Sequence, residues 1–409
     1  VVTGVQTCAL PISRMCGIVG YVGHVGAAEV LVNGLRRLEY RGYDSAGIAL
    51  VGDRNLRLVK QAGKVLEMAA AAGGAWGELS ADPASIGIAH TRWATHGPPN
   101  DVNAHPHLDG TGRFALVHNG IIENYRDLRA GLQAAGHEFV SDTDSEVLAH
   151  LVEECYESDL LQAVCAVLQR VEGTFGIAVL CQDHPDEMVV ARRGSPIVIG
   201  VGRDETIVAS DAAAIVPFTR QAIYLDDDDV AVIDRDGVDI RNIFNVPVTR
   251  EIAHLDWDSK AAEKGGFEHF MLKEIFEQPE ALRNSIGGRL NTALSTAVLS
   301  GLNFTPRDIA DINRVVIVGC GTSMHAGMVG EYYFEDLADL PAEVEQAAEF
   351  RYRNPIMSSR DFVLAISQSG ETADTLAAVR EAKQKGGLIA GLCNVVGSTI
   401  ARETGRGIY

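Results

Sequence analysis

Hydrophobic and polar positions divide the chain into two regions with different patterns. In the first, short apolar or alternating stretches are separated by turn residues, which predicts many strands. The expected strands are Cys16–Val22, Ala46–Val51, Ile86–His90, Phe114–His118, Gly176–Cys181, Met188–Ala191, Pro196–Val201, Thr206–Ala209 and Val230–Asp234. The expected helices are Ala27–Leu38, Tyr125–Ala135, Ser145–Tyr156 and Leu160–Val171. Many strands with few helices predict a layered α/β domain with sheets inside and helices outside.

The second region begins with a helix at Phe270–Ile275, with Pro279 beyond it, and then alternates apolar strands with helices. The expected strands are Val315–Val318, Glu343–Gln346, Phe362–Ile366 and Leu388–Cys393, and the expected helices are Met324–Leu337 and Thr372–Lys383. This alternation predicts a doubly wound parallel sheet. A fifth strand is expected near Arg406–Tyr409, where the sequence stops, so we expect this domain to be incomplete.

These patterns imply three boundaries. Residues 1–14 lack the basic start and apolar stretch of a signal peptide and resemble vector-derived sequence, so we expect a non-native leader. Residues 15–249 form the first expected domain, and 265–409 form the second. The polar, weakly patterned residues 250–264 are expected to link them.

Composition narrows the possible functions. The 409 residues are 46% hydrophobic and 22% charged, as in soluble globular proteins. A net charge of −20 argues against a nucleic-acid partner, which requires a basic face. No apolar run approaches the roughly 18 residues of a membrane span, so no membrane partner is expected. Seven scattered cysteines form neither a disulfide framework nor a paired zinc motif, which favours the reducing cytoplasm.

Met15-Cys16 directly precedes a predicted strand. If the chain began at Cys16, a thiol and a free α-amine would share one residue, and an amine with a pKa of about 8 can accept a proton at neutral pH. A small buried cysteine in a strand is the alternative interpretation. The fourteen residues before Met15 would block the amine while they remain attached.

Three other clusters carry chemistry in the same region. Arg92, in HTRWATHG after a strand, suits a carboxylate. Asn119 and Gly120 end another strand and could donate two N–H groups to an oxyanion. Asp144, in SDTD before a helix, could be an N-cap or could receive an ammonium group. Together with Cys16, these groups describe a glutamine amidohydrolase.

Metal sites are not expected in this region. Five histidines lie between His90 and His118, but their spacing fits neither an i, i+4 pair on a helix nor a standard zinc pattern. The acidic run Asp226–Asp229 is interpreted as a solvated turn.

These motifs, with CGIVGYVG, LEYRGYDSAG, NAHPH and HNGIIENY, closely resemble the class II glutamine amidotransferases from residue 16 to about 240. The resemblance implies an N-terminal-nucleophile hydrolase fold and needs no metal or cofactor. It implies that Cys16 is the nucleophile, that Asn119 and Gly120 form the oxyanion hole, that Arg92, Thr95, His96 and Asp144 bind glutamine, and that Trp93 gates an ammonia passage.

Two loops of the second region lie where a strand meets a helix: VGCGTS ending at Ser323 and SQSGET starting at Ser367. Hydroxyl groups and N–H groups at a helix N-terminus can bind an anion. Ordinary helix capping is the alternative for either loop. Two such loops on adjacent strands favour a sugar-phosphate pocket.

GCGTS and ISQSGETADT resemble the sugar isomerase (SIS) domain. Its combination with a class II glutaminase and the segment EIFEQP is similar to glutamine–fructose-6-phosphate aminotransferase (isomerizing). In that family, Thr322, Ser323, Ser367, Gln368, Ser369 and Thr372 match positions that bind the sugar phosphate. The family is typically a homodimer, and it continues into a second isomerase domain that this sequence lacks.

The resemblance implies conversion of fructose 6-phosphate and glutamine to glucosamine 6-phosphate and glutamate. For the 409 residues alone, we expect at most glutamine hydrolysis through Cys16. Two alternatives stay open: another class II amidotransferase, such as the phosphoribosyl-diphosphate enzyme, and a phosphosugar-binding regulatory module with an inactive glutaminase. The sequence assigns no role to Arg41 or Tyr43.

Overall fold

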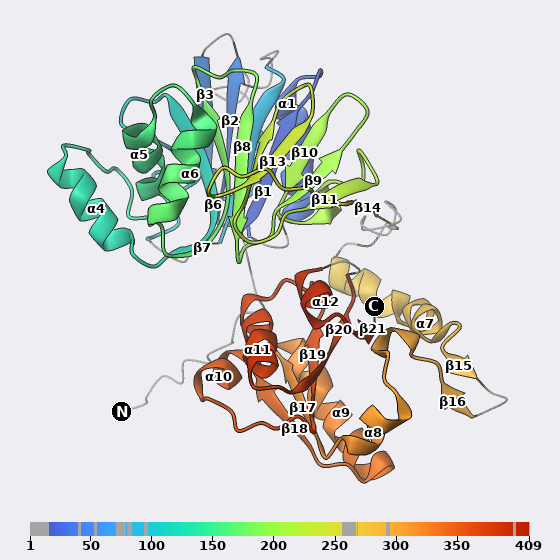
Figure 1. Cartoon of the computed structure of the whole chain (residues 1–409). Coiled ribbons are helices and arrows are strands. Elements are labelled where there is room, and N and C mark those ends of the chain that lie inside the picture. The colour runs from blue at the N-terminus through green and yellow to red at the C-terminus, as the bar shows by residue number, and fades with distance from the viewer. Residues whose placement is uncertain are drawn as a thin grey trace, which may run out of the picture. The chain divides into compact units, whose positions relative to one another are not determined.

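A computed structural model of the chain describes residues 16–39, 42–52, 55–70, 79, 84–93, 97–255, 267, 269–291, 295–395 and 398–408. The chain divides into two compact units, Arg14–Glu263 and Lys264–Tyr409 (Figure 1). Each unit is described by itself.

The first unit, which we call the amidotransferase unit, contains two antiparallel sheets. The eight-stranded sheet has the order β14 (Ile252–His254), β11 (Gln221–Tyr224), β9 (Val198–Val201), β10 (Thr206–Ala209), β1 (Gly17–Val22), β4 (Ile86–Arg92), β2 (Ser45–Gly52) and β3 (Asn55–Ala62). The six-stranded sheet has the order β13 (Val238–Asn242), β12 (Asp229–Ile233), β8 (Met188–Arg193), β7 (Gly173–Cys181), β6 (Phe114–Ile122) and β5 (His107–Leu108).

Helices cover the outer faces of these sheets. Along β1, Ile18 packs into a cluster shared by both sheets, whereas its neighbour Val19 faces a cluster with α1 (Ala27–Leu38). This alternation is the two-residue period of a strand. On the other sheet, α5 (Glu146–Cys155) and α6 (Leu160–Arg170) bury their apolar sides. The order of layers is therefore helix, sheet, sheet, helix, which confirms the layered α/β prediction.

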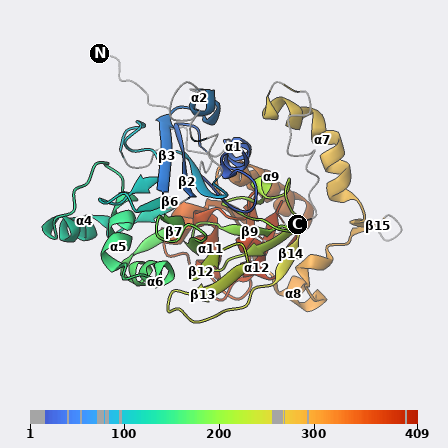
Figure 2. The ribbon, with the colours of Figure 1, turned by 90° about the horizontal axis from the view of Figure 1, so that it is seen from above.

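The second unit, which we call the SIS unit, contains a parallel five-stranded sheet. Its order is β18 (Ala342–Gln346), β17 (Arg314–Gly319), β19 (Asp361–Ser367), β20 (Leu388–Cys393) and β21 (Gly407–Ile408). Its main helices, all labelled in Figure 1, are α7 (Phe270–Ile286), α8 (Pro306–Asp311), α9 (Thr322–Ala338), α10 (Ala347–Tyr352), α11 (Ala373–Gln384) and α12 (Thr399–Thr404). Figure 2 shows α7 and α8 from above.

The two faces of this sheet pack against different helices. Val316 and Val318 pack with residues of α10, α11 and α12, whereas Val315 and Ile317 pack with Phe334 of α9. Helices on both faces of a parallel sheet confirm the doubly wound prediction. After β17, the chain first adds β18 on one side of it and then β19 on the other side. The direction in which strands are added therefore reverses between β17 and β19. Ligands of such sheets bind at this point.

Several elements differ from the sequence-based prediction. Helix α7 continues through Pro279 to Ile286 instead of ending at Ile275, because a proline removes one backbone hydrogen bond but keeps a helical φ. Strand β14 pairs with β11, which corrects the start of the expected linker at 250–264. Other elements that were not predicted include β3, β5, β11, α2 (Val65–Ala70), α8, α10, α12 and the hairpin of β15 (Leu290–Asn291) and β16 (Thr296–Ala297).

Candidate functional site

Cys16 lies directly before β1, in the middle of the eight-stranded sheet, and is half-buried. The backbone N–H of Trp93 donates to the Cys16 Sγ at 3.2 Å, and the thiol lies 3.6 Å from the carbonyl of Trp93. A hydrogen bond from an N–H group favours the thiolate form of a cysteine. The residue proposed as nucleophile therefore has a donor at its sulfur.

Asn119 reaches Cys16 from the other sheet. Its Nδ2 donates to the Cys16 carbonyl at 2.9 Å, while its Oδ1 lies 2.9 Å from His90 Nε2. Because Oδ1 can only accept, Nε2 carries the proton and the amide nitrogen faces the cysteine. A side-chain amide has two N–H groups, so one bond to the carbonyl leaves a donor for an oxyanion.

Gly120 follows Asn119 with φ +137°, a conformation that favours glycine. An added Cβ would lie 2.1 Å from the carbonyl oxygen of Thr174 on the neighbouring strand β7. Position 120 therefore requires glycine, and the close strand fixes the backbone that the sequence assigns to the oxyanion hole.

Arg92 and Asp144 are both buried, with 3% of each residue exposed. An Arg92 nitrogen lies 3.4 Å from the carbonyl of Pro98, and Asp144 Oδ2 accepts from the N–H of Ile122 at 2.8 Å. At the start of α5, Ser145 makes no side-chain cap bond, and the Glu146 N–H donates to the Thr143 Oγ1 at 3.4 Å. The bond from Ile122 joins Asp144 to β6 and not to the start of α5.

Trp93 is half-buried, and its ring meets that of Tyr43 edge-on at 5.5 Å. Trp93 thus contacts Cys16 through its backbone and Tyr43 through its side chain. The other expected glutamine-binding residues, Thr95 and His96, lie outside the described residues, as does Arg41.

Three buried histidines lie in contact with one another, and His90 is the one bonded to Asn119. The ring centroids of His90 and His105 are 4.2 Å apart, and those of His105 and His107 are 4.5 Å apart. Burial lowers the pKa of His90 to about 3, although its bond to Asn119 opposes the shift. Burial also lowers the pKa of His105 and of His107 well below the usual value. At neutral pH these rings are uncharged, and the Nε2–H of His90 holds the Asn119 amide.

The sequence did not single out His90 as a support for Asn119. The two residues are 29 positions apart on strands of different sheets, so only the packing of the sheets brings them together. A histidine at the end of a predicted strand, two residues before Arg92, was the only signal.

In the SIS unit, the expected residues of the second loop lie between β19 and α11. The Ser367 Oγ accepts from the N–H of Gly370 at 3.0 Å and lies 3.2 Å from the Thr372 Oγ1. The Ser369 Oγ accepts from the N–H of Glu371 at 3.2 Å. Ser369 and Thr372 are half-buried, and Gln368 is exposed. These contacts form a compact turn with Gly370 at φ +67°.

The first loop lies at the end of the adjacent strand β17. Gly319 pairs with Ile366, so Thr322 and Ser323 start α9 beside the Ser367 loop. Thr375 of α11 also donates to the Cys320 Sγ at 3.7 Å. The fold therefore brings together two helix N-termini and the hydroxyl groups near them, which is suitable for binding a phosphate group.

Each of the two units matches a known protein family. The glutamine amidotransferase domain family matches residues 90–217, and the SIS domain family matches residues 308–409. A glutamine–fructose-6-phosphate aminotransferase [isomerizing] of Chlorobaculum tepidum is 51% identical over 399 residues, which is 97% of this chain and 64% of the relative. The Thermus thermophilus enzyme of the same name is 51% identical over 395 residues, with the same coverage.

The chain is a homologue of the glutamine–fructose-6-phosphate aminotransferases. It spans 64% of the length of these curated relatives. A solved glutamine phosphoribosylpyrophosphate amidotransferase from B. subtilis, 20% identical, matches with a TM-score of 0.50 over 93% of this chain and 81% of that chain. At that identity the likeness concerns the fold alone, and it confirms the N-terminal-nucleophile amidotransferase fold. The SIS domain match confirms the sugar isomerase fold of the second unit.

Among the described residues, no helix combines the length and the apolar character needed to cross a bilayer.

Proposed function

We propose that this chain supplies the glutamine-hydrolysing and first phosphosugar-binding parts of a glutamine–fructose-6-phosphate aminotransferase. Glutamine would donate its amide nitrogen to fructose 6-phosphate, giving glucosamine 6-phosphate and glutamate. The observation that carries the proposal is the hydrogen bond that the Asn119 Nδ2 donates to the Cys16 carbonyl at 2.9 Å, which joins the proposed oxyanion donor to the residue that carries the proposed nucleophile.

In the proposed first step, the Cys16 thiolate attacks the glutamine carboxamide carbon. Asn119 and the backbone of Gly120 stabilise the oxygen as it becomes negative, a contribution worth about 10²–10³ in rate per donor in other enzymes. The tetrahedral intermediate collapses to a thioester and releases ammonia. Water then hydrolyses the thioester to glutamate.

The α-amine of Cys16 serves as the proton carrier in this proposal. It takes the thiol proton and gives it to the departing nitrogen, which requires a free amine. Active protein is therefore proposed to begin at Cys16.

Substrate binding uses the two charged groups on the α-carbon of glutamine. The buried Arg92 is proposed to bind the α-carboxylate, and Asp144 the α-ammonium group. Thr95 and His96 would complete this site, and Trp93 would separate it from the route of ammonia. In the SIS unit, Thr322, Ser323, Ser367, Gln368, Ser369 and Thr372 would bind the sugar phosphate.

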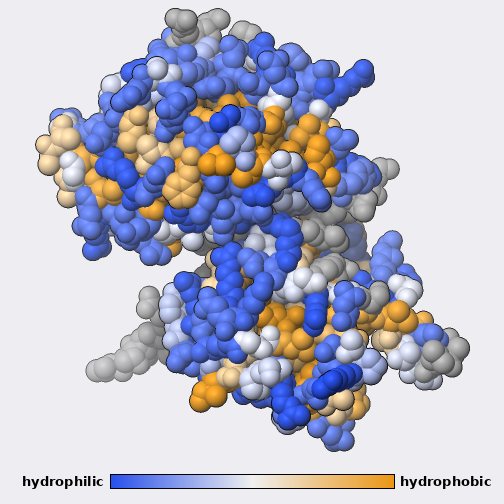
Figure 3. Space-filling view, viewed as in Figure 1, coloured by the Kyte–Doolittle hydropathy of each residue, from blue (hydrophilic) through white to orange (hydrophobic). Residues whose placement is uncertain are grey.

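A homodimer and a cytoplasmic location complete the proposal. The described part of the SIS unit carries 17 of the 26 exposed large hydrophobic side chains, although it is the smaller unit. On α9 they include Tyr332 at 71% and Leu337 at 78% exposure. Figure 3 shows apolar residues interrupting the polar surface. A surface of this kind suits association with a second subunit. The six cysteines described are free thiols, as expected in a reducing compartment.

The decisive experiment compares the given chain with one expressed from Met15, using intact mass and glutaminase activity together. We expect activity only in molecules whose mass shows Cys16 as the first residue. Full activity in molecules that retain residues 1–14 would rule out the α-amine as proton carrier. Unchanged activity in Cys16→Ala would instead favour a phosphosugar-binding module with an inactive glutaminase.

A further inference from the structure

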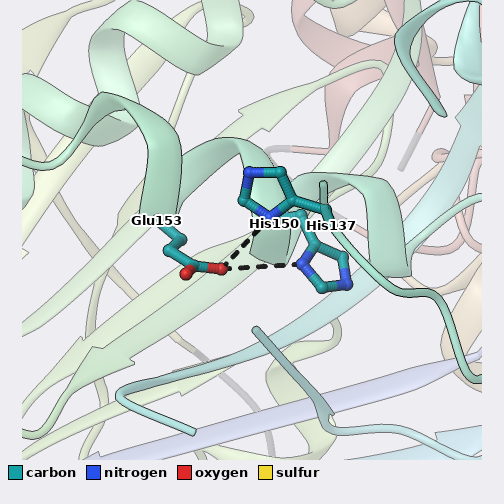
Figure 4. A group of neighbouring side chains, drawn as sticks. All are labelled: His137, His150 and Glu153. Carbon is teal, nitrogen blue, oxygen red and sulfur yellow. Dashed lines mark ion pairs between the residues drawn. The ribbon is translucent and has the colours of Figure 1, made fainter. Parts of the chain in front are cut away.

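A cluster of three potential metal ligands lies on the helical side of the amidotransferase unit, and neither the sequence motifs nor the proposed reaction uses it. Glu153 Oε2 lies 3.4 Å from His137 Nδ1 and 3.6 Å from His150 Nδ1. The three ligand atoms all lie within 4.8 Å of one another. Figure 4 shows the two rings on the same side of the Glu153 carboxylate.

Local structure fixes all three side chains. His150 and Glu153 are three residues apart on α5, so they share one face of the helix. His137 follows the end of α4 (Tyr125–Ala134), where its N–H bonds to the Leu132 carbonyl and that of Gly136 to the Gln133 carbonyl. With Gly136 at φ +100°, these bonds form a Schellman motif, which sets the position of His137.

The surroundings of His150 are unusual for a buried histidine. It is 1% exposed, and neither ring nitrogen has a hydrogen-bond partner in the described part of the chain. Buried polar groups are nearly always paired, because an unpaired one loses its bonds to water. One ring nitrogen faces Glu153, and Nε2 faces the buried carboxylate of Glu146 at 3.8 Å. A carboxylate behind the second nitrogen is the usual support of a metal-binding histidine.

The two distances from Glu153 fit a small tetrahedral ion. Zinc bonds of about 2.0–2.2 Å place tetrahedral ligands about 3.3–3.6 Å apart, close to both separations from Glu153. Two imidazoles and one carboxylate favour zinc or a similar transition ion over Ca²⁺ or Mg²⁺, which prefer oxygen ligands. The side chains of His137 and Glu153 are 16% and 21% exposed, so water can reach a fourth position.

We propose that His137, His150 and Glu153 bind one zinc ion, with water as the fourth ligand. The ion would join the end of α4 to α5 and so hold the intervening segment, which contains the glutamine-site residue Asp144. The site would stabilise the amidotransferase unit, and it does not depend on the proposed reaction.

The test is isothermal titration of ZnCl₂ into the full chain carrying Cys16→Ala, which removes a competing thiol from the catalytic site. We expect one tight site per chain. His137→Gln and Glu153→Gln should each weaken it about tenfold or more, and both residues are exposed enough for the variants to fold. His184→Gln is the matched control. His184 also forms an ion pair with a glutamate three residues later in the chain, Glu187 at 3.0 Å, but that pair has no second histidine to complete a metal site.

X-ray absorption at the zinc edge provides the second measurement. We expect only nitrogen and oxygen neighbours at about 2.0–2.2 Å, without sulfur at about 2.3 Å. Absence of tight binding, a sulfur shell, or equal affinity in wild type and in both ligand variants would overturn the site. Loss of affinity in His184→Gln equal to that in His137→Gln would overturn it as well.

Discussion

The amidotransferase unit and the SIS unit expose their functional polar groups to different degrees. In the first, Arg92, Asn119 and Asp144 are each at most 5% exposed, and other groups hold them in position. In the second, Ser367 is buried, but Thr322 and Gln368 are exposed at the ends of parallel strands. Stabilising a developing charge requires fixed donors shielded from water, whereas binding a phosphate requires N–H groups that an incoming ligand can reach.

The two units should therefore respond independently to changes in their sites. The largest effect is expected for Cys16→Ala, which should lower glutaminase activity about a thousandfold or more, because the attacking sulfur is lost. Cys16 is half-buried and alanine is small, so the fold should remain. Affinity of the SIS unit for fructose 6-phosphate, measured by calorimetry on the same variant, should not change. A parallel loss of sugar affinity would contradict independent units.

Acid should destabilise the amidotransferase unit more than the SIS unit. The folded pKa values of His90, His105 and His107 lie below the unfolded value of about 6.5, so the unfolded state binds more protons as the pH falls below 6.5. Their stabilising contribution is complete above pH 6.5 and is lost below it, down to about pH 3 for His90. If the unfolded state binds three more protons than the folded state, one on each histidine, the folding equilibrium constant falls up to about a thousandfold for each unit by which the pH is lowered.

Tryptophan fluorescence would follow the acid unfolding of the amidotransferase unit alone, because the three tryptophans, Trp76, Trp93 and Trp257, all precede the SIS unit. His105→Phe provides the control. Neither ring nitrogen of His105 has a hydrogen-bond partner among the described residues, so phenylalanine should fold and reduce the acid dependence by one proton. An unchanged pH slope in this variant would show that His105 does not contribute.

Asn119→Ala should lower kcat about a hundredfold or more, because it removes one oxyanion donor and leaves His90 Nε2–H without its acceptor. KM for glutamine should change much less. Ile121→Ala is a suitable control, because this residue is on the same strand and 45% exposed. Equal effects of both substitutions on kcat would indicate a general disturbance of β6.

The smallest effect is expected in the SIS unit. Ser367→Ala removes the acceptor of the Gly370 N–H, which should loosen the turn and weaken fructose 6-phosphate binding about tenfold. Glutaminase activity should be unaffected. Ser358→Ala, at an exposed turn of the same unit, provides the control for sugar affinity. A Ser367→Ala protein with unchanged sugar affinity would show that this turn does not bind the phosphate.

The sequence predicted both folds because apolar spacing is strong in their central strands. Buried strands such as β1 and β4 were recognised, but β3 at the sheet edge was not, since its side chains are half-exposed and polar residues interrupt it. The proposed nucleophile Cys16 and the residues proposed to act with it could be named from local motifs. The bond between His90 and Asn119 could not, because it depends on how two sheets face each other. His137 and Glu153 were missed for a similar reason: their approach depends on the turn that ends α4.

The central position of β1 has a consequence for biosynthesis. Val19 of this strand pairs with Ala209, about 190 residues later. At a translation rate of roughly 5–20 residues per second, the partner strand is made about 10–40 s after β1. During that interval the sheet around Cys16 is incomplete on one side, and the nascent end is still accessible to processing enzymes. On the proposal that active protein begins at Cys16, this interval is available for removal of the preceding residues before the sheet is complete.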